Sequence, residues 1–391
     1  MADQHFETKA IREQLGQTQH KEHATPLFLT SSFTFDSAEE GAAIFQGELD
    51  ANLYSRFSNP NTAELINKLC LLEEAESGVV TASGMAAVFT SFAALLKSGD
   101  HVIACQSIFG NSKYILSTVL PNWGINVTYV EIDDHDAWTS SIQSNTKLLF
   151  LETPSNPTLL VADMTFLGNL CKTHNIIFAV DNCFATPYLQ QPIKFGADLI
   201  IHSATKYIDG QGRVLGGAIL GPKKIIDLCY DFIRRTGPSL SPFNAWVLSK
   251  SLETLAVRMD RHCQNAMQLA EFLSDHEAID YVIYPHLKSH PHYELAKKQM
   301  SQGGGLVGCQ LRGGIKRGQK FLNALKLHSL TANLGDTRSI ATHPASTTHS
   351  KLSSEEQISA GITPGFIRFS VGLEHIEDII TDIDQALNVS K

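Results

Sequence analysis

Between residues 63 and 250 the chain alternates short apolar runs with longer segments in which apolar residues recur at helical spacing. The runs are rich in Val, Ile and Leu and are bounded by turn-forming residues, a pattern typical of strands buried on both faces of a parallel sheet. The intervening segments suit the helical crossovers that parallel strands require. We therefore predict an α/β fold here, with strands at residues 79–81, 102–105, 126–132, 148–151, 176–180 and 199–201.

The two ends of the chain show different patterns. Residues 1–58 contain a short helical segment near 8–14 followed by extended stretches, which predicts an arm that contacts a neighbouring subunit. A long amphipathic helix at 244–275 leads into a smaller α/β region, with strands at 281–284, 306–311 and 365–371 and helices at 319–325 and 375–387. The predicted division is an N-terminal arm at 1–58, a large domain at 59–250 and a small C-terminal domain at 251–391.

Composition and charge narrow the class of protein. Of the 391 residues 43% are hydrophobic and the formal net charge is −9, without the basic runs that a nucleic-acid or anionic-membrane surface needs. No apolar stretch approaches the length of a membrane span, and the polar N-terminus has no secretory signal pattern. The seven cysteines show no C-x-x-C spacing, which predicts buried free thiols in a reducing cytoplasm.

Reactive side chains follow the buried strand at 199–201. Ser203, Thr205 and Lys206 come directly after it, with four glycines close behind. A lysine that leaves a buried strand can lose solvation and become available as a Schiff-base nucleophile and general base. An ordinary loop lysine beside a Ser/Thr turn would show the same local pattern. Asn156 and Asp181 fall at the ends of two other predicted strands, where ligands of parallel sheets bind, and this coincidence favours a site.

Two further segments carry groups suited to an anion. Ser83, Gly84 and Met85 separate a predicted strand from an alanine-rich helix, so their free backbone N–H groups suit a phosphate, although a simple tight connection explains them equally well. Tyr54 and Arg56 lie two residues apart in the extended arm and so share a face. An Asn-Pro-Asn-Thr turn then begins the helix at 63–74.

An aspartate at one strand end, a lysine at another 25 residues later and an anion cradle match pyridoxal 5'-phosphate (PLP) better than any other cofactor. A more specific indication of the protein family comes from the motifs YSRFSNPN, ASGMAA, ETPSNPT, VDNCFATP, ADLIIHSATKY, THP and IRFSVGLE. With them the chain resembles, from residue 25 to 387, the Cys/Met-metabolism family of fold-type I PLP enzymes, which includes cystathionine γ-synthase and the homoserine-ester sulfhydrylases. The resemblance implies a mostly parallel, seven-stranded type of sheet in the large domain.

The resemblance also implies a role for each candidate residue. Lys206 would be the Schiff-base lysine and proton shuttle, Asp181 the partner of the pyridine nitrogen, and Phe109 the ring that stacks on the cofactor. Asn156 and Arg368 would contact the substrate, Asn156 also lying on the O3′ side of the cofactor, and Ser339 would help to position the substrate or the lysine. The implied phosphate ligands are Ser83, Gly84, Met85, Ser203 and Thr205, with Tyr54 and Arg56 from the neighbouring subunit.

Shared phosphate binding implies a homodimer as the smallest active unit, and the family resemblance implies a homotetramer built as a dimer of dimers. No metal site is predicted, because His202, His343 and His349 lack ligand spacing and suit structural roles better. The glycines at 303–305 suit a turn better than a phosphate loop.

Departures from the family pattern narrow the reaction. Phe109-Gly110 stands where most members have Tyr-Gly, so the stacking ring stays while the phenol is absent. Asn111 occupies a position at which methionine γ-lyases typically have cysteine, and Cys183 replaces the usual threonine of the Asp-Asn-Thr motif. The implied activity is γ-replacement on a homoserine ester, with O-succinylhomoserine and sulfide as substrates. The acetyl ester, cysteine as nucleophile, γ-elimination, a type I aminotransferase and a cofactor-storing protein with a retired site are the alternatives.

Overall fold

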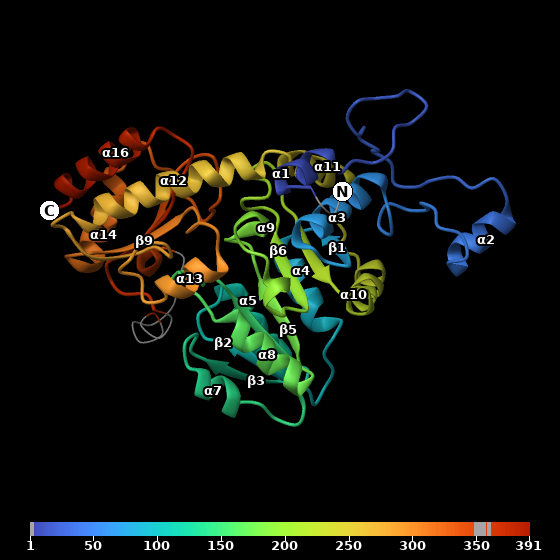
Figure 1. Cartoon of the computed structure of the whole chain (residues 1–391), viewed down its shortest axis with the longest axis horizontal. Helices are drawn as coiled ribbons and strands as arrows, with labels where there is room; N and C mark the ends of the chain where they lie inside the picture. The colour runs from blue at the N-terminus through green and yellow to red at the C-terminus, as the bar shows by residue number, and fades with distance from the viewer. Residues whose placement is uncertain (1–3, 348–356, 358–360) are drawn as a thin grey trace.

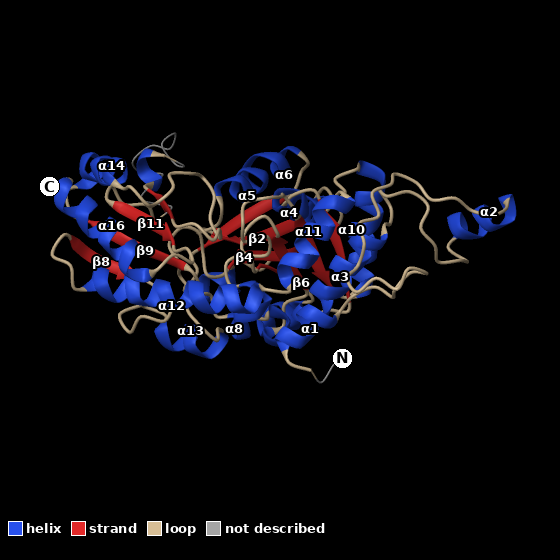
Figure 2. Cartoon of the chain, turned by 90° about the horizontal axis from the view of Figure 1, so that it is seen from above, coloured by secondary structure: helices blue, strands red, loops and turns tan. Residues whose placement is uncertain are grey.

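The computed structural model describes residues 4–347, 357 and 361–391. Its strands fall into two groups, a large sheet and a smaller one, which lie side by side along the long axis of the molecule (Figure 2). The long helix α12 (Leu255–Ser274) runs beside both groups, while the C-terminal helix α16 (Ile376–Val389) lies over the smaller sheet (Figure 1). This is the α/β architecture that the sequence predicts.

The larger sheet has seven strands among the described residues, in the order β1-β7-β6-β5-β4-β2-β3. The strands β6, β5, β4, β2 and β3 run parallel to one another, and β7 is antiparallel to both β6 and β1. Their bounds are β1 Ser77–Thr81, β2 His101–Cys105, β3 Asn126–Val130, β4 Thr146–Glu152, β5 Ile177–Asp181, β6 Leu199–Ser203 and β7 Gly217–Gly221. The predicted strands of this region are all confirmed, and β7 is an addition.

Alternation along β6 explains why its sequence is continuously apolar. Leu199 and Ile201 point into one core with residues of α4 (Gly84–Ala93), α8 (Met164–His174) and α10 (Lys223–Thr236). Ile200 points into the opposite core, with residues of α3 (Pro60–Glu73) and α11 (Pro242–Leu252). Helices therefore cover both faces of the sheet. Polar side chains that serve a ligand are then expected at the carboxyl ends of the strands.

The smaller sheet is antiparallel, in the order β10-β11-β9-β8. Its strands are β8 Ile279–Ile283, β9 Leu306–Leu311, β10 Ile340–Thr342 and β11 Phe366–Ser370, and they share a core with α12, α14 and α16. The remaining helices of the described chain are α1 Phe6–Arg12, α2 Ala38–Gln46, α5 Gly110–Tyr114, η1 Ile115–Val119, α6 Leu120–Asn122, α7 His135–Ser140, α9 Thr186–Leu189, η2 Pro192–Phe195, α13 Tyr293–Gln299, α14 Gly314–Ala324 and η3 Pro344–Ser346.

The single helix predicted at 244–275 is wrong, because the structure divides it into α11 and α12. The break follows Leu252, and Thr254 has φ −114° and ψ 9°, outside the helical region. The Arg258 guanidinium donates to the carbonyl oxygen of Ser251 at 3.0 Å, and the Thr254 hydroxyl donates to the same oxygen at 3.2 Å. The Thr254 backbone N–H also donates to this oxygen at 3.2 Å, where a continuous helix would use the N–H of Leu255.

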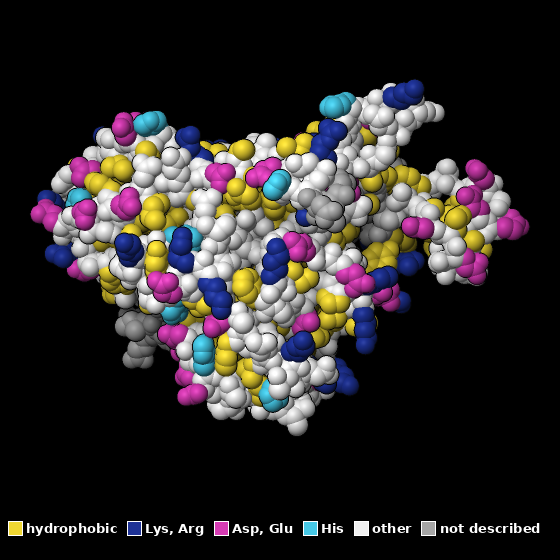
Figure 3. All heavy atoms as spheres, in the orientation of Figure 1, with side chains coloured by type: hydrophobic (Ala, Val, Ile, Leu, Met, Phe, Trp, Pro, Cys, Tyr) yellow, Lys and Arg dark blue, Asp and Glu magenta, His cyan; other side chains and the backbone are white. Residues whose placement is uncertain are grey.

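The N-terminal arm contains α2, which stands away from the body of the molecule (Figure 1). The same projection is seen with all atoms drawn, and acidic side chains gather on it (Figure 3). The arm is anchored where Trp246 Nε1 donates to the carbonyl oxygen of Thr25 at 2.9 Å and where the Thr25 hydroxyl donates to Glu64. Its apolar side chains Leu29 and Phe45 are 71% and 60% exposed, which suits a partner surface.

Acid sensitivity is expected from His262 in α12. This buried side chain bonds the carbonyl oxygen of Val371 through Nδ1 at 2.7 Å, and burial lowers its pKa from 6.5 to about 4. The unfolded chain then binds the proton more readily, so stability is lost as the pH falls below the unfolded value. Between about pH 7.5 and about pH 5 the loss from this one group is about 2 kcal/mol. A His262→Asn variant, which keeps a donor for Val371, should lack this loss when unfolding free energies are compared at the two pH values. Equal losses in both proteins would contradict the assignment.

Candidate active site

The carboxyl ends of β4, β5 and β6 surround a cavity of about 290 Å³. The strand register pairs Glu152 with Asp181 and Asp181 with Ile201, so the residues that follow these strands emerge at one edge. Ten of the predicted site residues line the cavity: Ser83, Gly84, Met85, Phe109, Asn156, Asp181, Ser203, Thr205, Lys206 and Arg368. Segments far apart in the sequence therefore supply one site.

Lys206 lies in the turn that follows β6. Its Nζ donates to Asn333 Oδ1 at 2.7 Å, and burial, with help from the Arg368 charge, lowers the pKa of the amine. Arg258 fixes this turn, because its guanidinium donates to the carbonyl oxygens of Tyr207 at 2.6 Å and Ile208 at 3.3 Å. A desolvated amine on a fixed turn suits a covalent bond to an aldehyde and proton transfer.

Asp181 is the last residue of β5 and accepts the backbone N–H of Cys183 at 2.9 Å. Burial raises the pKa of Asp181 to about 6, while that N–H and the neighbouring His202 and Lys206 act to lower it. His202 is fixed by the buried Glu73, whose Oε1 lies 2.6 Å from its Nε2. A carboxyl group in this position suits a protonated ring nitrogen as its partner. The positive charge of that nitrogen would favour the charged form of the carboxyl group.

The start of α4 forms a cradle for an anion. The Ser83 hydroxyl caps the helix by accepting the N–H of Ala86 at 3.2 Å, and Gly84 and Met85, whose N–H groups have no partner within the helix, line the cavity. A Cβ on Gly84 would lie 2.5 Å from the Ser203 Cβ, so only glycine allows Ser203 this close to the helix. The Thr205 hydroxyl accepts the Gly216 N–H at 3.1 Å. These groups fit the phosphate of PLP.

Arg368 reaches the cavity from β11 of the smaller sheet. Its guanidinium is buried, and one terminal nitrogen donates to Asn156 Oδ1 at 2.8 Å. Among the residues that the structure describes, Arg368 has no salt bridge and its Nε has no hydrogen-bond partner. Burial lowers the pKa of Arg368 to about 10, which still leaves it charged at neutral pH. A buried cation with unused donors suits a carboxylate ligand.

Phe109 and Asn111 line the cavity at the start of α5, with the Phe109 side chain 41% exposed. Its backbone N–H donates to Glu152 Oε1 at 2.8 Å. The ring is thus presented to the space beside Asp181 and Lys206, and it brings no hydroxyl there.

Three predicted site residues lie outside the cavity lining. Tyr54 and Arg56 are on the arm, where the Arg56 guanidinium donates to the carbonyl oxygen of Arg234 and lies 4.7 Å from the centre of the Phe57 ring. Ser339 is fully buried, donates to Glu374 Oε2 at 2.9 Å and accepts the Gly372 N–H at 2.9 Å. Their predicted roles stay predictions, and the lysine amine is held by Asn333 in this structure.

Sequence reasoning passed over Asn333 and Glu152. Asn333 lies in a segment without regular structure, and its contact with Lys206 joins residues 127 positions apart, so no local pattern marks it. The sequence did mark Glu152 as a candidate site residue, because it ends the apolar run of β4 at the same edge of the sheet as Asp181.

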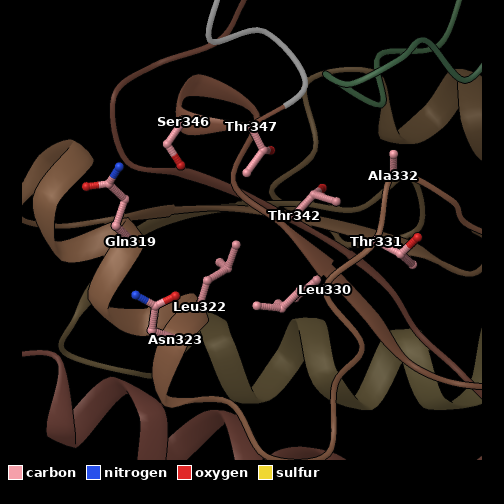
Figure 4. Close-up of a pocket in the computed structure, with 10 residues that line it drawn as sticks. Gln319, Leu322, Asn323, Leu330, Thr331, Ala332, Thr342, Ser346 and Thr347 are labelled. Carbon is pink, nitrogen blue, oxygen red and sulfur yellow. The ribbon is translucent and has the colours of Figure 1, made fainter.

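A second hollow, of about 790 Å³, lies beside α14 and β10 (Figure 4). Its labelled polar side chains include Gln319, Asn323 and Thr342, and among the described residues no charged side chain lines it. It adjoins the segment 330–332, and Ala332 also lines the first cavity. Lys206, Asp181 and Arg368 all line the first of these two spaces.

The histidines considered as metal ligands have other partners. His202 pairs with Glu73, and His343 lies 2.7 Å from the Ser346 hydroxyl and 2.9 Å from the carbonyl oxygen of Pro364. His349 lies outside the described residues. Within the described part of the chain no three His, Cys, Asp or Glu side chains gather as a metal site would require, and no helix there has the length and apolarity to cross a membrane.

Comparisons with known proteins identify the family. The model of the family described as Cys/Met metabolism PLP-dependent enzyme matches residues 7–388. The chain belongs to this family. It is 43% identical over 382 residues to an O-succinylhomoserine sulfhydrylase of Pseudomonas aeruginosa, covering 98% of this chain and 95% of the relative. It is 44% identical over 368 residues to an L-methionine γ-lyase of Fusobacterium nucleatum subsp. polymorphum, covering 93% of each.

The fold comparison gives the same result. A crystal structure of an O-acetylhomoserine (thiol)-lyase from Campylobacter jejuni superposes with a TM-score of 0.94 at 36% identity, covering 98% of this chain and all of the other. That structure contains a pyridoxyl-lysine phosphate. The protein is therefore a PLP-dependent enzyme of fold type I, as its sequence motifs imply. Its relatives in the Cys/Met metabolism family include lyases and sulfhydrylases, so membership alone leaves the substrate open.

Proposed function

We propose that this enzyme converts O-succinylhomoserine and sulfide into homocysteine and succinate, a step of methionine biosynthesis. The observation that carries the proposal is the pair Phe109 and Asn111 at the cavity wall, where a phenol and a cysteine would favour a methionine-degrading lyase. Similarity to a sulfhydrylase across nearly the whole chain supports it. The 44% identity to an L-methionine γ-lyase makes γ-elimination the second candidate.

The residues of the cavity have different roles in the proposed reaction. Arg368, with Asn156 fixed beside it, binds the α-carboxylate of an amino-acid substrate and so orients the α-carbon toward Lys206. The Lys206 amine, once freed by the substrate, takes the α-proton and moves protons at the β-carbon. Bound PLP supplies the electron sink that stabilises the carbanion and allows the ester group to leave. Asp181 supports this by keeping a negative charge beside the ring nitrogen.

A product assay tests the proposed reaction. The PLP-loaded enzyme is incubated with O-succinylhomoserine, with and without sulfide, and homocysteine and 2-oxobutyrate are quantified. We expect homocysteine to dominate when sulfide is present. Dominant 2-oxobutyrate in both reactions would contradict replacement and favour a γ-lyase, with methionine then assayed as substrate.

The same assay separates the remaining alternatives. Faster turnover of the acetyl ester would make the enzyme an O-acetylhomoserine sulfhydrylase, and preference for cysteine over sulfide would favour cystathionine synthesis. A half-reaction with an oxo acid would indicate an aminotransferase. Absence of turnover with every ester would favour a retired site.

We further propose that Tyr54 and Arg56 complete the phosphate site of a neighbouring subunit in a homodimer, two of which form a tetramer. The exposed apolar side chains of the arm support this, since they lack a cover within one chain. We propose a cytoplasmic location on the ground that all seven cysteines are free thiols in the structure.

Replacing Arg56 with alanine should weaken PLP retention by about tenfold, because one charged hydrogen bond to phosphate is lost. The dissociation constant is measured from the visible absorbance of the bound cofactor during dialysis. Arg235→Ala serves as the control, because Arg235 is an exposed arginine paired with Asp231. Unchanged retention in the Arg56 variant would count against the shared site.

A further inference from the structure

Two carboxyl groups end neighbouring strands beneath the cofactor site. Glu152 is the last residue of β4 and Asp181 the last of β5, and the register pairs them directly. Side chains of paired residues in parallel strands point to the same side of the sheet, and both of these line the cavity. Only Asp181 has a role in the family-based account, so the second carboxyl group needs an explanation.

Glu152 contacts the segment that presents the stacking ring, through the backbone N–H of Phe109 and the side chain of Ser112 in α5. Its Oε1 accepts the backbone N–H of Phe109 at 2.8 Å, and the glutamate side chain itself is 6% exposed. Phe109 precedes the short helix α5, and its φ of −55° and ψ of 135° place it outside the helix. The carboxyl group therefore ties the start of this segment to the end of β4.

The surroundings favour the ionisation of only one of the two acids. Lys206 and His202 act on Asp181 and favour its charge, whereas no described cation forms a salt bridge with Glu152. Burial and the neighbouring Asp181 raise the pKa of Glu152 well above its ordinary value, and the thiols of Cys105 and Cys183 nearby are neutral because burial raises their pKa values. Two adjacent buried carboxylates repel each other, so these surroundings favour the proton on Glu152.

We propose that Glu152 is a positioning residue that, as a neutral carboxylic acid, holds Phe109 in place for ring stacking and leaves Asp181 as the single negative charge beside the ring nitrogen. The inference concerns how this chain holds PLP and does not depend on which substrate the enzyme uses. It is therefore tested without substrate.

The test is a double-mutant cycle on cofactor binding. The variants Glu152→Gln, Glu152→Ala, Phe109→Ala and the double alanine variant are compared by the PLP dissociation constant and the visible circular dichroism of the bound cofactor. Glutamine keeps an acceptor and a neutral group, so we expect its dissociation constant to stay within about twofold of the parent. Glu152→Ala strands the Phe109 N–H and should weaken binding about tenfold, with a reduced dichroism signal.

The double variant decides whether the two residues act together. If Glu152 acts through Phe109, removing it from the Phe109→Ala protein should change the dissociation constant by less than about twofold. A further tenfold loss in that background would overturn the proposal, as would a Glu152→Gln protein that behaves like Glu152→Ala.

A pH titration keeps the inference testable if the alanine variant does not fold. The pH midpoint of the absorbance change of bound PLP should agree within about half a unit between the parent and Glu152→Gln, because both present a neutral group. A difference of more than about one unit would show that Glu152 is charged, contrary to the proposal.

Discussion

Replacing Lys206 with alanine is expected to reduce turnover by at least about 10³-fold, since it removes both the covalent partner of the aldehyde and the base that moves protons. The neighbouring groups of the site are unaffected by this change, apart from Asn333, which loses the amine that it accepts from at 2.7 Å. The variant should also lose the visible absorbance band of the lysine-bound cofactor. Both quantities are measured on protein reconstituted with PLP.

The matched control for Lys206 is Lys172→Ala, which removes an exposed lysine from the last turn of α8. It should keep the activity and absorbance of the parent. Turnover by the Lys206 variant within tenfold of the parent would contradict the assignment of both roles.

Replacing Arg368 with alanine has the second largest expected effect. It removes the buried cation that donates to Asn156 in the cavity, and truncating one partner of a buried charged pair lowers kcat/KM by about 10²- to 10³-fold. The visible absorbance of bound PLP should stay near that of the parent, because this residue acts on the substrate. Arg368→Lys should recover part of the loss, since lysine offers a charge without the two-pronged geometry.

Arg338→Ala is the control for Arg368, because Arg338 is a mostly exposed arginine paired with Asp336. It should leave kcat/KM within about twofold, as expected for a surface ion pair. An unchanged KM for the homoserine ester in Arg368→Ala would contradict carboxylate recognition by this residue.

The parallel core of the fold was predictable because each of its strands carries its own signal. The run Leu199–Ser203 contains three apolar residues whose side chains point alternately into two different cores. The antiparallel strand β7 was missed because Gly216 and Gly217 suggest a turn. Gly217 is needed for a different reason, since a Cβ there would lie 2.2 Å from the carbonyl oxygen of Ser83. Close approach between distant segments is invisible to local pattern.

The helix α2 shows a local signal that was overlooked. Ser37 caps it by accepting the N–H of Glu40 at 3.1 Å, so the sequence Ser-Ala-Glu-Glu is a capping pattern within a stretch predicted to be extended. By contrast, at the break between α11 and α12 the Arg258 guanidinium bonds the Ser251 carbonyl oxygen and also holds the turn after Lys206. Helical periodicity does not encode these side-chain contacts.

The sequence guided the choice of candidate residues where they follow strand ends and gave less guidance where they lie in loops. Asp181 and Lys206 follow strands, and the cavity brings them together with Arg368 from the other sheet. The family resemblance gave Ser339 a share in positioning the lysine, whereas Asn333, six residues earlier, makes that contact in the structure. Spacing within this irregular segment does not show which polar side chain faces the cavity.

The most direct test of the account is to trap the cofactor on the protein. The PLP-loaded enzyme is reduced with borohydride, digested and analysed by peptide mass spectrometry. We predict that the added pyridoxyl phosphate is found on Lys206, the lysine that lines the same cavity as the Ser83–Met85 cradle and Asp181. Labelling of a different lysine, or no stable label in a protein that binds PLP, would contradict the central claim that this cavity holds the cofactor through Lys206.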